Sequence, residues 1–189
     1  AIKDTNNELV ASYDVADSVG ILDSYFPNAK FYTDESKIVR FIEKSNLNNK
    51  SKIDYLVICT PNYLHDSHIR MALRRGANAI CEKPLVLNPW NLEPLKQIER
   101  ETGCKVYNVL QLRLHKSIIA LKKKIDDSPK DKIFDIDLTY ITSRGKWYYT
   151  SWKGSSTKSG GVTTNIGIHF FDMLSWIFGN IRKNMVHIY

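Results

Sequence analysis

One lysine of this 189-residue chain stands where it can take part in chemistry. Lys83 follows a short apolar run that ends at Cys81, and it lies between Glu82 and Pro84. Proline disfavours helix at the residue before it, so Lys83 is held extended at the tip of a predicted strand. An ammonium group there can hydrogen-bond a reacting hydroxyl and stabilise an alkoxide that develops on it. A solvated lysine in a surface turn is the alternative.

A second candidate group is the imidazole of His169, which follows Asn165 by four residues. That spacing puts both side chains on one face of a predicted helix. Imidazole is suited to accept a hydroxyl proton near neutral pH, whereas Asn165 can only orient a substrate or His169. A helical histidine that serves packing is the alternative. Asp172 either belongs to the same site or pairs with a neighbouring base.

Other polar residues follow predicted strands. Asp14 ends one of them, and a carboxylate there can accept hydrogen bonds from both hydroxyls of an NAD ribose while repelling the extra phosphate of NADP. Thr60, Pro61 and Asn62 end another, where the proline stops the strand and the polar pair can face a nicotinamide ribose. His65, one turn later, either contacts the same group or serves only packing.

The elements that must position these residues alternate between strand and helix. Strands are predicted over 8–14, 30–32, 53–60, 79–81 and 105–110, and helices over 17–26, 35–44, 65–75 and 89–102. Thr33 is the predicted N-cap of the second helix, and Gly76 ends the third. The alternation predicts an α/β fold with a parallel sheet, and the apolar run 53–60 predicts a strand buried on both faces.

In a parallel sheet of this kind, ligands lie beyond the carboxyl ends of the strands. The polar candidates share that placement: Asp14, Thr60, Asn62, Glu82, Lys83 and Gln111.

From about Gln111 the pattern changes, which predicts one domain over 1–110 and the start of a second over 111–189. A helix over 117–127 is followed by an alternating strand over 134–142, a polar aromatic loop over 143–161 and a helix over 163–178. The single strand has no partner in this sequence with which to complete a sheet. Loop cations are candidates to bind a diphosphate or a uronate, with solvated charges as the alternative: Arg144, Lys146, Lys153 and Lys158. Loop aromatics can stack on a sugar or base, or form a subunit contact: Trp147, Tyr148, Tyr149 and Trp152.

Composition is that of a soluble globular protein, with 43% hydrophobic and 25% charged residues. No apolar run approaches the roughly 20 residues of a membrane span, and nothing marks the chain for export, so a cytoplasmic protein is expected. The net charge of +7 is spread over scattered lysines. That distribution favours a solvated face over a nucleic-acid site, and it fits an anionic small substrate equally well. Neither a CxxC pair nor the spacing of a closed zinc site occurs, so no metal is expected.

Three segments in this order resemble the glucose–fructose oxidoreductase, inositol dehydrogenase and MocA family: Cys59-Thr-Pro-Asn-Tyr-Leu-His65, Cys81-Glu-Lys-Pro-Leu85 and Ser159-Gly-Gly-Val-Thr-Thr-Asn-Ile-Gly-Ile-His-Phe-Phe-Asp172. The runs 108–115 and 140–153 resemble the branch that oxidises UDP-N-acetylglucosaminuronate at C3 of the sugar.

The resemblance implies a Rossmann-type, doubly wound parallel sheet that binds NAD, followed by the start of an α+β open-sheet substrate domain. It implies that Lys83 and His169 are catalytic. The implied cofactor-binding residues are Asp14, Thr60, Pro61, Asn62, His65, Glu82, Lys83 and Gln111. The implied substrate-binding residues are Arg144, Lys158, Asn165 and His169.

The sequence departs from the family pattern in two ways. No glycine-rich turn that would cradle a pyrophosphate precedes Asp14, and the far half of the substrate domain is absent, so we expect a fragment that lacks the first strand of its sheet. Asn165 stands where most of the family has aspartate, although the UDP-sugar-acid branch resembles this sequence there. The amide shifts acid–base duty onto His169 and Lys83.

The function implied by the resemblance is oxidation of a nucleotide-linked sugar acid in surface-polysaccharide biosynthesis, by a homodimer or homotetramer with neither nucleic-acid nor membrane partners. A dehydrogenase of a free polyol or hexose is the nearer alternative. A non-catalytic member that binds NAD or sugar is another, although retention of both Lys83 and His169 argues against it. A fragment with an incomplete pyrophosphate site that binds nothing is a third.

Overall fold

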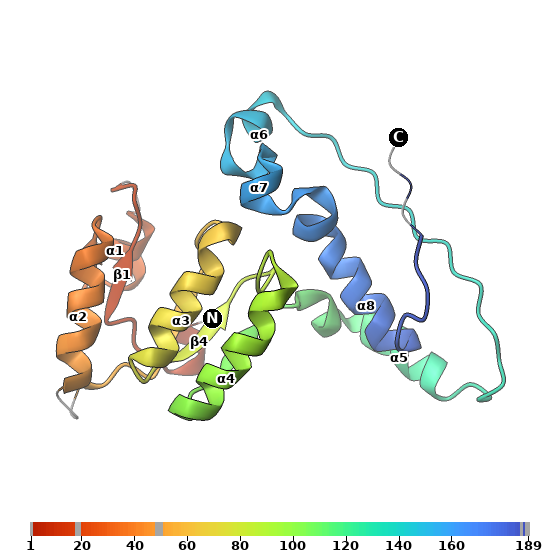
Figure 1. Ribbon diagram of the computed structural model, residues 1–189, viewed down its shortest axis with the longest axis horizontal. Helices are drawn as coiled ribbons and strands as arrows, with labels where there is room; N and C mark the ends of the chain where they lie inside the picture. The colour runs from red at the N-terminus through yellow and green to blue at the C-terminus, as the bar shows by residue number, and fades with distance from the viewer. Residues whose placement is uncertain (1, 18–19, 48–50, 186, 188–189) are drawn as a thin grey trace. The chain divides into compact units, whose positions relative to one another are not determined.

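The computed structural model describes residues 2–17, 20–47, 51–185 and 187, and the chain forms two compact units, Ala1–Asp54 and Tyr55–Tyr189 (Figure 1). Each unit contains a small sheet whose strands are all parallel. The predicted parallel α/β fold is therefore confirmed.

In the first unit, strands β1 (Ala11–Tyr13) and β2 (Lys30–Tyr32) pair in parallel. Helix α1 (Ile21–Tyr25) lies between them in sequence and is shorter than predicted; residues 18 and 19 of the predicted helix lie outside the described residues. Helix α2 (Glu35–Leu47) packs on the two strands and buries Ile38 and Ile42. This unit therefore places Asp14 directly after a strand, as predicted.

The predicted N-cap of α2 is wrong by one residue. Asp34, and not Thr33, directly precedes the helix, and its Oδ1 accepts a hydrogen bond of 2.8 Å from the backbone N–H of Ser36. A carboxylate caps a helix well because its charge also meets the positive end of the helix dipole. Hydrogen bonds from the side chain and the backbone N–H of Ser36 hold the pKa of Asp34 below its usual value.

In the second unit, strands β3 (Tyr55–Ile58), β4 (Asn78–Cys81) and β5 (Val106–Asn108) form a sheet in that order. Helices α3 (His65–Arg74) and α4 (Leu92–Thr102) pack on one of its faces. The buried core is formed by Ile58, Ile69, Ala72, Leu73, Ala79, Cys81, Leu95 and Ile98. Gly76, with a φ of +75°, follows α3 as predicted. The predicted helix 89–102 begins with a 3-10 turn, η4 (Pro89–Asn91), before α4.

The prediction that the strand within 53–60 is buried on both faces is wrong. Tyr55 and Val57 are each 49% exposed, and Tyr107 on β5 is 50% exposed. Side chains alternate across a strand, and both helices cover the opposite face, so these three side chains lie on the face that α3 and α4 leave uncovered. A continuous run of apolar residues therefore does not indicate a strand buried on both faces here.

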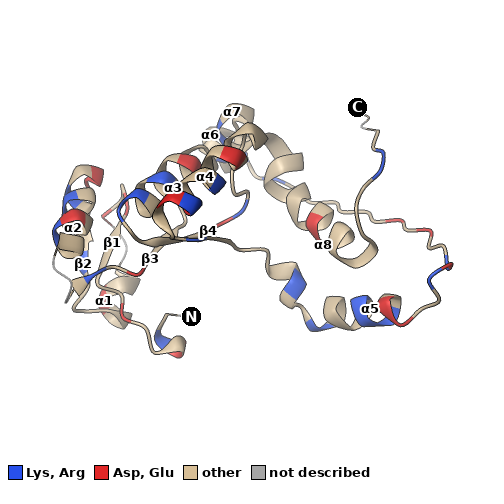
Figure 2. Cartoon of the chain, turned by 60° about the horizontal axis from the view of Figure 1, so that its bottom comes forward, with Lys and Arg blue, Asp and Glu red and all other residues tan. Residues whose placement is uncertain are grey.

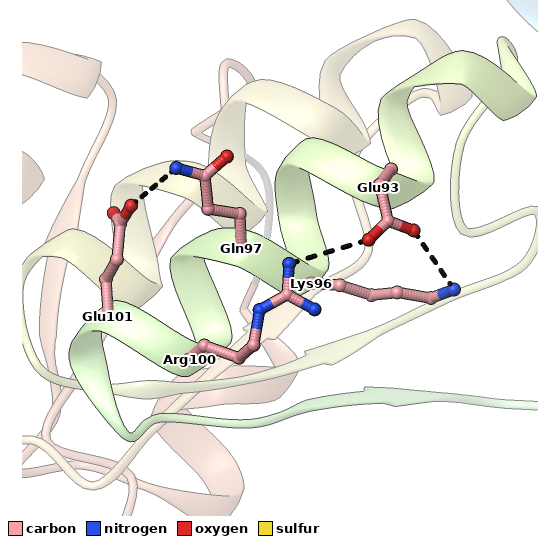
Figure 3. Close-up of polar contacts among 5 residues, drawn as sticks. All are labelled: Glu93, Lys96, Gln97, Arg100 and Glu101. Atoms are coloured by element: carbon pink, nitrogen blue, oxygen red, sulfur yellow. Dashed lines mark hydrogen bonds and ion pairs between the residues drawn. The ribbon is translucent and has the colours of Figure 1, made fainter.

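The surface of α4 is covered by short-range polar pairs (Figure 3). Glu93 accepts hydrogen bonds from Lys96 at 3.4 Å and from Arg100 at 3.5 Å, and Gln97 donates to Glu101 at 2.7 Å. Exposed pairs of this kind contribute little to stability, on the order of 0–1 kcal/mol each. Further lysines lie on α5 (Lys116–Asp126), where Lys123 and Lys124 are exposed (Figure 2). Both helices carry the solvated charge that the sequence predicted.

The chain after β5 contains helices but no strand among its described residues. The predicted strand over 134–142 is wrong: the segment is an irregular connection between α5 and α6 (Figure 1). A strand needs a partner for its backbone groups, and no described strand pairs with this segment, whose apolar residues Ile136 and Ile141 are 45% and 90% exposed.

Short elements then lead to the last helix. They are α6 (Lys146–Thr150), the 3-10 turn η6 (Trp152–Gly154), α7 (Ser156–Ser159), the π turn η7 (Thr163–Gly167) and α8 (Ile168–Phe178). The predicted helix over 163–178 is thus present, with a π turn at its start. No described helix has the length and apolarity needed to cross a membrane.

Replacing Leu73, which is fully buried on α3, by alanine should lower the free energy of unfolding by about 2–5 kcal/mol, because the cavity left behind cannot collapse fully. Leu114, which is 78% exposed in the turn η5 (Gln111–Leu114), provides the matched control, and its replacement by alanine should change the value by less than about 0.5 kcal/mol. Urea unfolding followed by circular dichroism measures both. Equal losses from the two variants would contradict this assignment of the core.

Candidate active site

The turn after β3 directs Asn62 into the protein. Pro61 has φ −56° and ψ 144°, which ends the strand, and Asn62 then opens the 3-10 turn η3 (Asn62–Leu64). The Asn62 side chain is only 4% exposed, and its Nδ2 donates to the carbonyl of Ser159 at 2.8 Å and to Oδ1 of Asn165 at 3.3 Å. Asn62 therefore ties this turn to a segment about a hundred residues further along the chain.

The turn after β4 carries Lys83, whose peptide bond to Pro84 is cis. His65, in the first turn of α3, connects this turn to the preceding one. Its Nδ1 lies 2.7 Å from the carbonyl oxygen of Pro84, and its Nε2 lies 2.8 Å from the carbonyl oxygen of Thr60. The ring is fully buried, and both nitrogens are engaged by the backbone. His65 thus holds the two strand-end turns together.

The side chain of Lys83 rests on a single residue. Its Nζ donates to the backbone carbonyl of Asn165 at 2.6 Å and to Oδ1 of the same residue at 3.3 Å. An ammonium group has three N–H donors, so one remains for a ligand. Burial lowers the pKa of Lys83, the neighbouring charge of Lys153 lowers it further, and Glu82 opposes this shift.

Local backbone geometry brings both oxygens of Asn165 to Lys83. Asn165 lies in the π turn η7, a rare element that is frequently found at functional sites. Gly160, just before it, has a φ of +78°, and a Cβ there would lie 2.7 Å from Cβ of Thr164. Both the backbone conformation and the close approach therefore require glycine. Because the chain from Asn165 to His169 passes through the π turn, the ordinary four-residue helix spacing does not describe how these two side chains are arranged.

His169 lies in the first turn of α8 and is partly buried, with no hydrogen-bond partner for its buried Nδ1. Burial lowers the pKa of His169, and the charge of Lys83 lowers it further, against opposing effects from Glu82 and Asp172. A lowered pKa keeps the imidazole neutral near pH 7, which is the form that can accept a proton.

A cavity of about 310 Å³ joins most of these groups. Three cations, Lys83, Arg144 and Lys153, face it with one carboxylate, Glu82, so its charge is positive. Its lining residues are Cys59, Thr60, Asn62, His65, Glu82, Lys83, Arg144, Trp147, Tyr148, Trp152, Lys153, Asn165 and Ile166. Burial raises the pKa of the Cys59 thiol, which is thereby kept protonated. No described group of three or more His, Cys, Asp or Glu side chains is arranged to hold a metal ion.

The remaining predicted site residues lie elsewhere. Gln111 lines a second cavity, formed by residues 108–111, 113 and 114. Lys158 is exposed, with its Nζ 5.6 Å from the centre of the Tyr63 ring. Asp14 is exposed in the first unit, and its Oδ1 accepts a hydrogen bond of 2.9 Å from the N–H of Ala16. Neither His169 nor Pro61 lines the first cavity.

Two contacts could not have been predicted from the sequence. Asp172 pairs through both oxygens with the guanidinium of Arg113, with Nε to Oδ2 at 2.8 Å, so it fixes α8 to the turn η5. This is the pairing alternative left open for Asp172, but nothing in the sequence named Arg113 as its partner. The carbonyl of Ser159, which accepts from Asn62, has no signal in the residue type because every residue has a carbonyl.

Family comparisons agree with this geometry. Residues 2–109 match the oxidoreductase family described as an NAD-binding Rossmann fold, and residues 122–189 match the C-terminal alpha/beta domain of the same family. The chain therefore belongs to the glucose–fructose oxidoreductase, inositol dehydrogenase and MocA family, as its motifs predicted. The prediction of a Rossmann-type domain for NAD is confirmed.

Two individual relatives show which members of the family the chain resembles. The WlbA (WbpB) dehydrogenase of Thermus thermophilus is 50% identical with a TM-score of 0.94, over 99% of this chain and 60% of that one. Its structures hold NAD with UDP-GlcNAcA or with alpha-ketoglutarate. Inositol 2-dehydrogenase of Rhizobium meliloti is 30% identical over 127 residues, which is 67% of this chain and 37% of that protein. The chain thus spans less than two thirds of the length of either relative.

We expect the imidazole of His169 to titrate with a midpoint below the usual value of about 6.5, so that it stays neutral as the pH falls toward that value. Lys83→Met should raise the midpoint because it removes a nearby positive charge, although burial still holds the midpoint low. Lys96→Met, which removes an exposed lysine of α4, is the control. NMR of the histidine ring protons measures all three proteins, and a midpoint that Lys83→Met leaves unchanged would contradict the proximity of the two groups.

Proposed function

We propose that the protein is an NAD-dependent dehydrogenase that oxidises the C3 hydroxyl of UDP-N-acetylglucosaminuronate. The observation that carries this proposal is the setting of Lys83, fixed by Asn165 on a cavity that two further cations line. A positive cavity favours an anionic sugar. The similarity to the Thermus thermophilus dehydrogenase solved with NAD and UDP-GlcNAcA supports the same substrate.

The residues present fit NAD. Thr60 and Asn62 follow β3 at its carboxyl end, the edge of a parallel sheet where nucleotides bind, and they line the cavity. In the first unit, Asp14 follows β1 directly and is exposed, so its carboxylate is open to ribose hydroxyls. Bound NAD supplies the acceptor for the hydride that leaves the sugar carbon.

The protein's own groups manage the proton and the developing charge. Neutral His169 accepts the proton of the substrate hydroxyl as the carbon loses its hydride, and the hydroxyl becomes a ketone. Lys83 donates its third N–H to the same oxygen and stabilises the negative charge that develops there. Asn165 holds Lys83 through two hydrogen bonds, so the donor is oriented before the reaction begins.

A dehydrogenase of a free polyol is the second candidate, because the chain is also 30% identical to an inositol 2-dehydrogenase.

The domain boundary at 110 and 111 and assembly into a homodimer or homotetramer are further parts of the proposal. A 2-oxoacid is proposed as the compound that reoxidises the cofactor, since the Thermus thermophilus relative was solved with alpha-ketoglutarate.

The test is the absorbance of NADH at 340 nm when the complete gene product is mixed with NAD and a sugar. We expect an increase with UDP-N-acetylglucosaminuronate and none with UDP-glucose or myo-inositol. In parallel samples alpha-ketoglutarate reoxidises the NADH and permits turnover, so turnover there is measured as the keto sugar formed and not as absorbance. An increase with myo-inositol alone would replace this proposal by the polyol dehydrogenase.

Lys83→Met should lower kcat on the order of 10²–10³-fold, because a hydrogen-bond donor that stabilises the developing negative charge is lost from the transition state. Lys96→Met removes the same charge from an exposed position of α4 outside the cavity lining and should leave kcat within a few-fold of the wild type. NAD binding, measured by calorimetry, should persist in both variants. Wild-type turnover in the Lys83→Met protein would disprove the assigned role.

A further inference from the structure

The ammonium group of Lys153 lies near two indole rings on the wall of the cavity. Its Nζ lies 5.5 Å from the ring centre of Trp147 and 5.8 Å from that of Trp152. The turn that carries it is tight, because a Cβ on Gly154 would lie 2.6 Å from the carbonyl oxygen of Tyr148. Contacts with two aromatic rings restrict an otherwise flexible lysine. Lys153 is thus a cation with a defined position.

Arg144 has a similar setting. Its guanidinium lies 5.2 Å from the ring centre of Tyr148, and its buried Nε has no hydrogen-bond partner. A buried N–H donor without an acceptor costs free energy until an acceptor is supplied. Among the described residues, neither Arg144 nor Lys153 forms an ion pair, whereas Arg113 is paired with Asp172. Two positioned cations on one cavity therefore lack an anion.

We propose that Lys153 and Arg144 bind a carboxylate on the sugar ring, and that they select a uronic acid over the corresponding uncharged sugar. This inference rests on the proposed function. The cavity, of about 310 Å³, is at the small end of ligand sites, and Lys83 lines it together with both cations. An anion that shares the cavity with the hydroxyl at Lys83 is then one carried by the same ring. The planar fork of Arg144 matches a carboxylate, and the indole faces match the C–H face of a sugar.

The position of Lys153 relative to Lys83 supports this arrangement. Lys153 and Lys83 line the same cavity, and the charge of Lys153 adds to the effect of burial in lowering the pKa of Lys83, against the opposing charge of Glu82. A carboxylate bound to Lys153 offsets that repulsion when the substrate is present. Lys158, by contrast, is exposed and does not line the cavity.

The experiment compares two ligands that differ only in the carboxylate, UDP-N-acetylglucosaminuronate and UDP-N-acetylglucosamine, by calorimetric titration of the complete gene product in the presence of NADH. The wild type should bind the acid more tightly than the uncharged sugar. Lys153→Met should weaken binding of the acid about 10- to 100-fold, the effect of one hydrogen bond to a charged group, and should leave the uncharged sugar unaffected. Arg144→Met should act in the same direction.

Lys153→Arg keeps the charge and should keep the preference for the acid, which separates loss of recognition from loss of folding. Lys96→Met, at an exposed position of α4 outside the cavity lining, is the control and should change neither ligand. An equal loss for both ligands in Lys153→Met would assign the cation to the diphosphate and overturn the inference, as would a wild type that binds both ligands equally. If the titration shows a preference for the acid but the absorbance assay with NAD shows no formation of NADH, the proposed oxidation is rejected and the recognition site is retained.

Discussion

Lys83 is partly withdrawn from water, and its Nζ rests on two oxygens of one residue, the carbonyl and the side-chain amide of Asn165. Burying an ammonium group is costly unless hydrogen-bond acceptors replace the lost water. Both acceptors here are uncharged, so they orient the lysine without neutralising it. Three other features of the second unit support this contact. The π turn presents both oxygens, Asn62 donates a hydrogen bond to the amide oxygen, and Gly160 leaves room for the side chain of Thr164.

The electrostatics of the cavity follow from an excess of cations over its one carboxylate, Glu82. Lys83, Arg144 and Lys153 face one another across a space in which only Glu82 is negative. Mutual repulsion and burial both act on Lys83, and Lys83 in turn acts on His169, so the pKa values of the lysine and the histidine are both lowered. An aspartate at 165 would have given Lys83 a partner of opposite charge. The asparagine provides no such charge.

The sequence located the residues at strand ends well, because strand length, proline and glycine are local signals. Thr60, Asn62, Glu82 and Lys83 lie where the βαβ pattern predicted, around one cavity. Hydrogen bonds between distant parts of the chain could not be predicted from the sequence. No residue pattern indicates that Asn62 donates to Ser159, because the acceptor is a backbone carbonyl. The prediction of a strand over 134–142 is wrong for a related reason. Alternating apolar and polar residues indicate a segment that can pair in a sheet, but a strand forms only where a partner strand lies beside it.

The hydrogen bonds that define the setting of Lys83 join distant parts of the chain. Lys83 reaches Asn165 across 82 residues, and Asn62 reaches Ser159 and Asn165 across 97 and 103. Closing loops of that size follows the formation of local helices and turns, because its entropic cost must be met before the contacts form. On the ribosome, Lys83 emerges long before Asn165 is synthesised, and until then it is an ordinary hydrated lysine. A nascent or partly folded chain therefore carries Lys83 without the hydrogen bonds that orient it, and the environment on which its proposed role depends forms only when folding is complete.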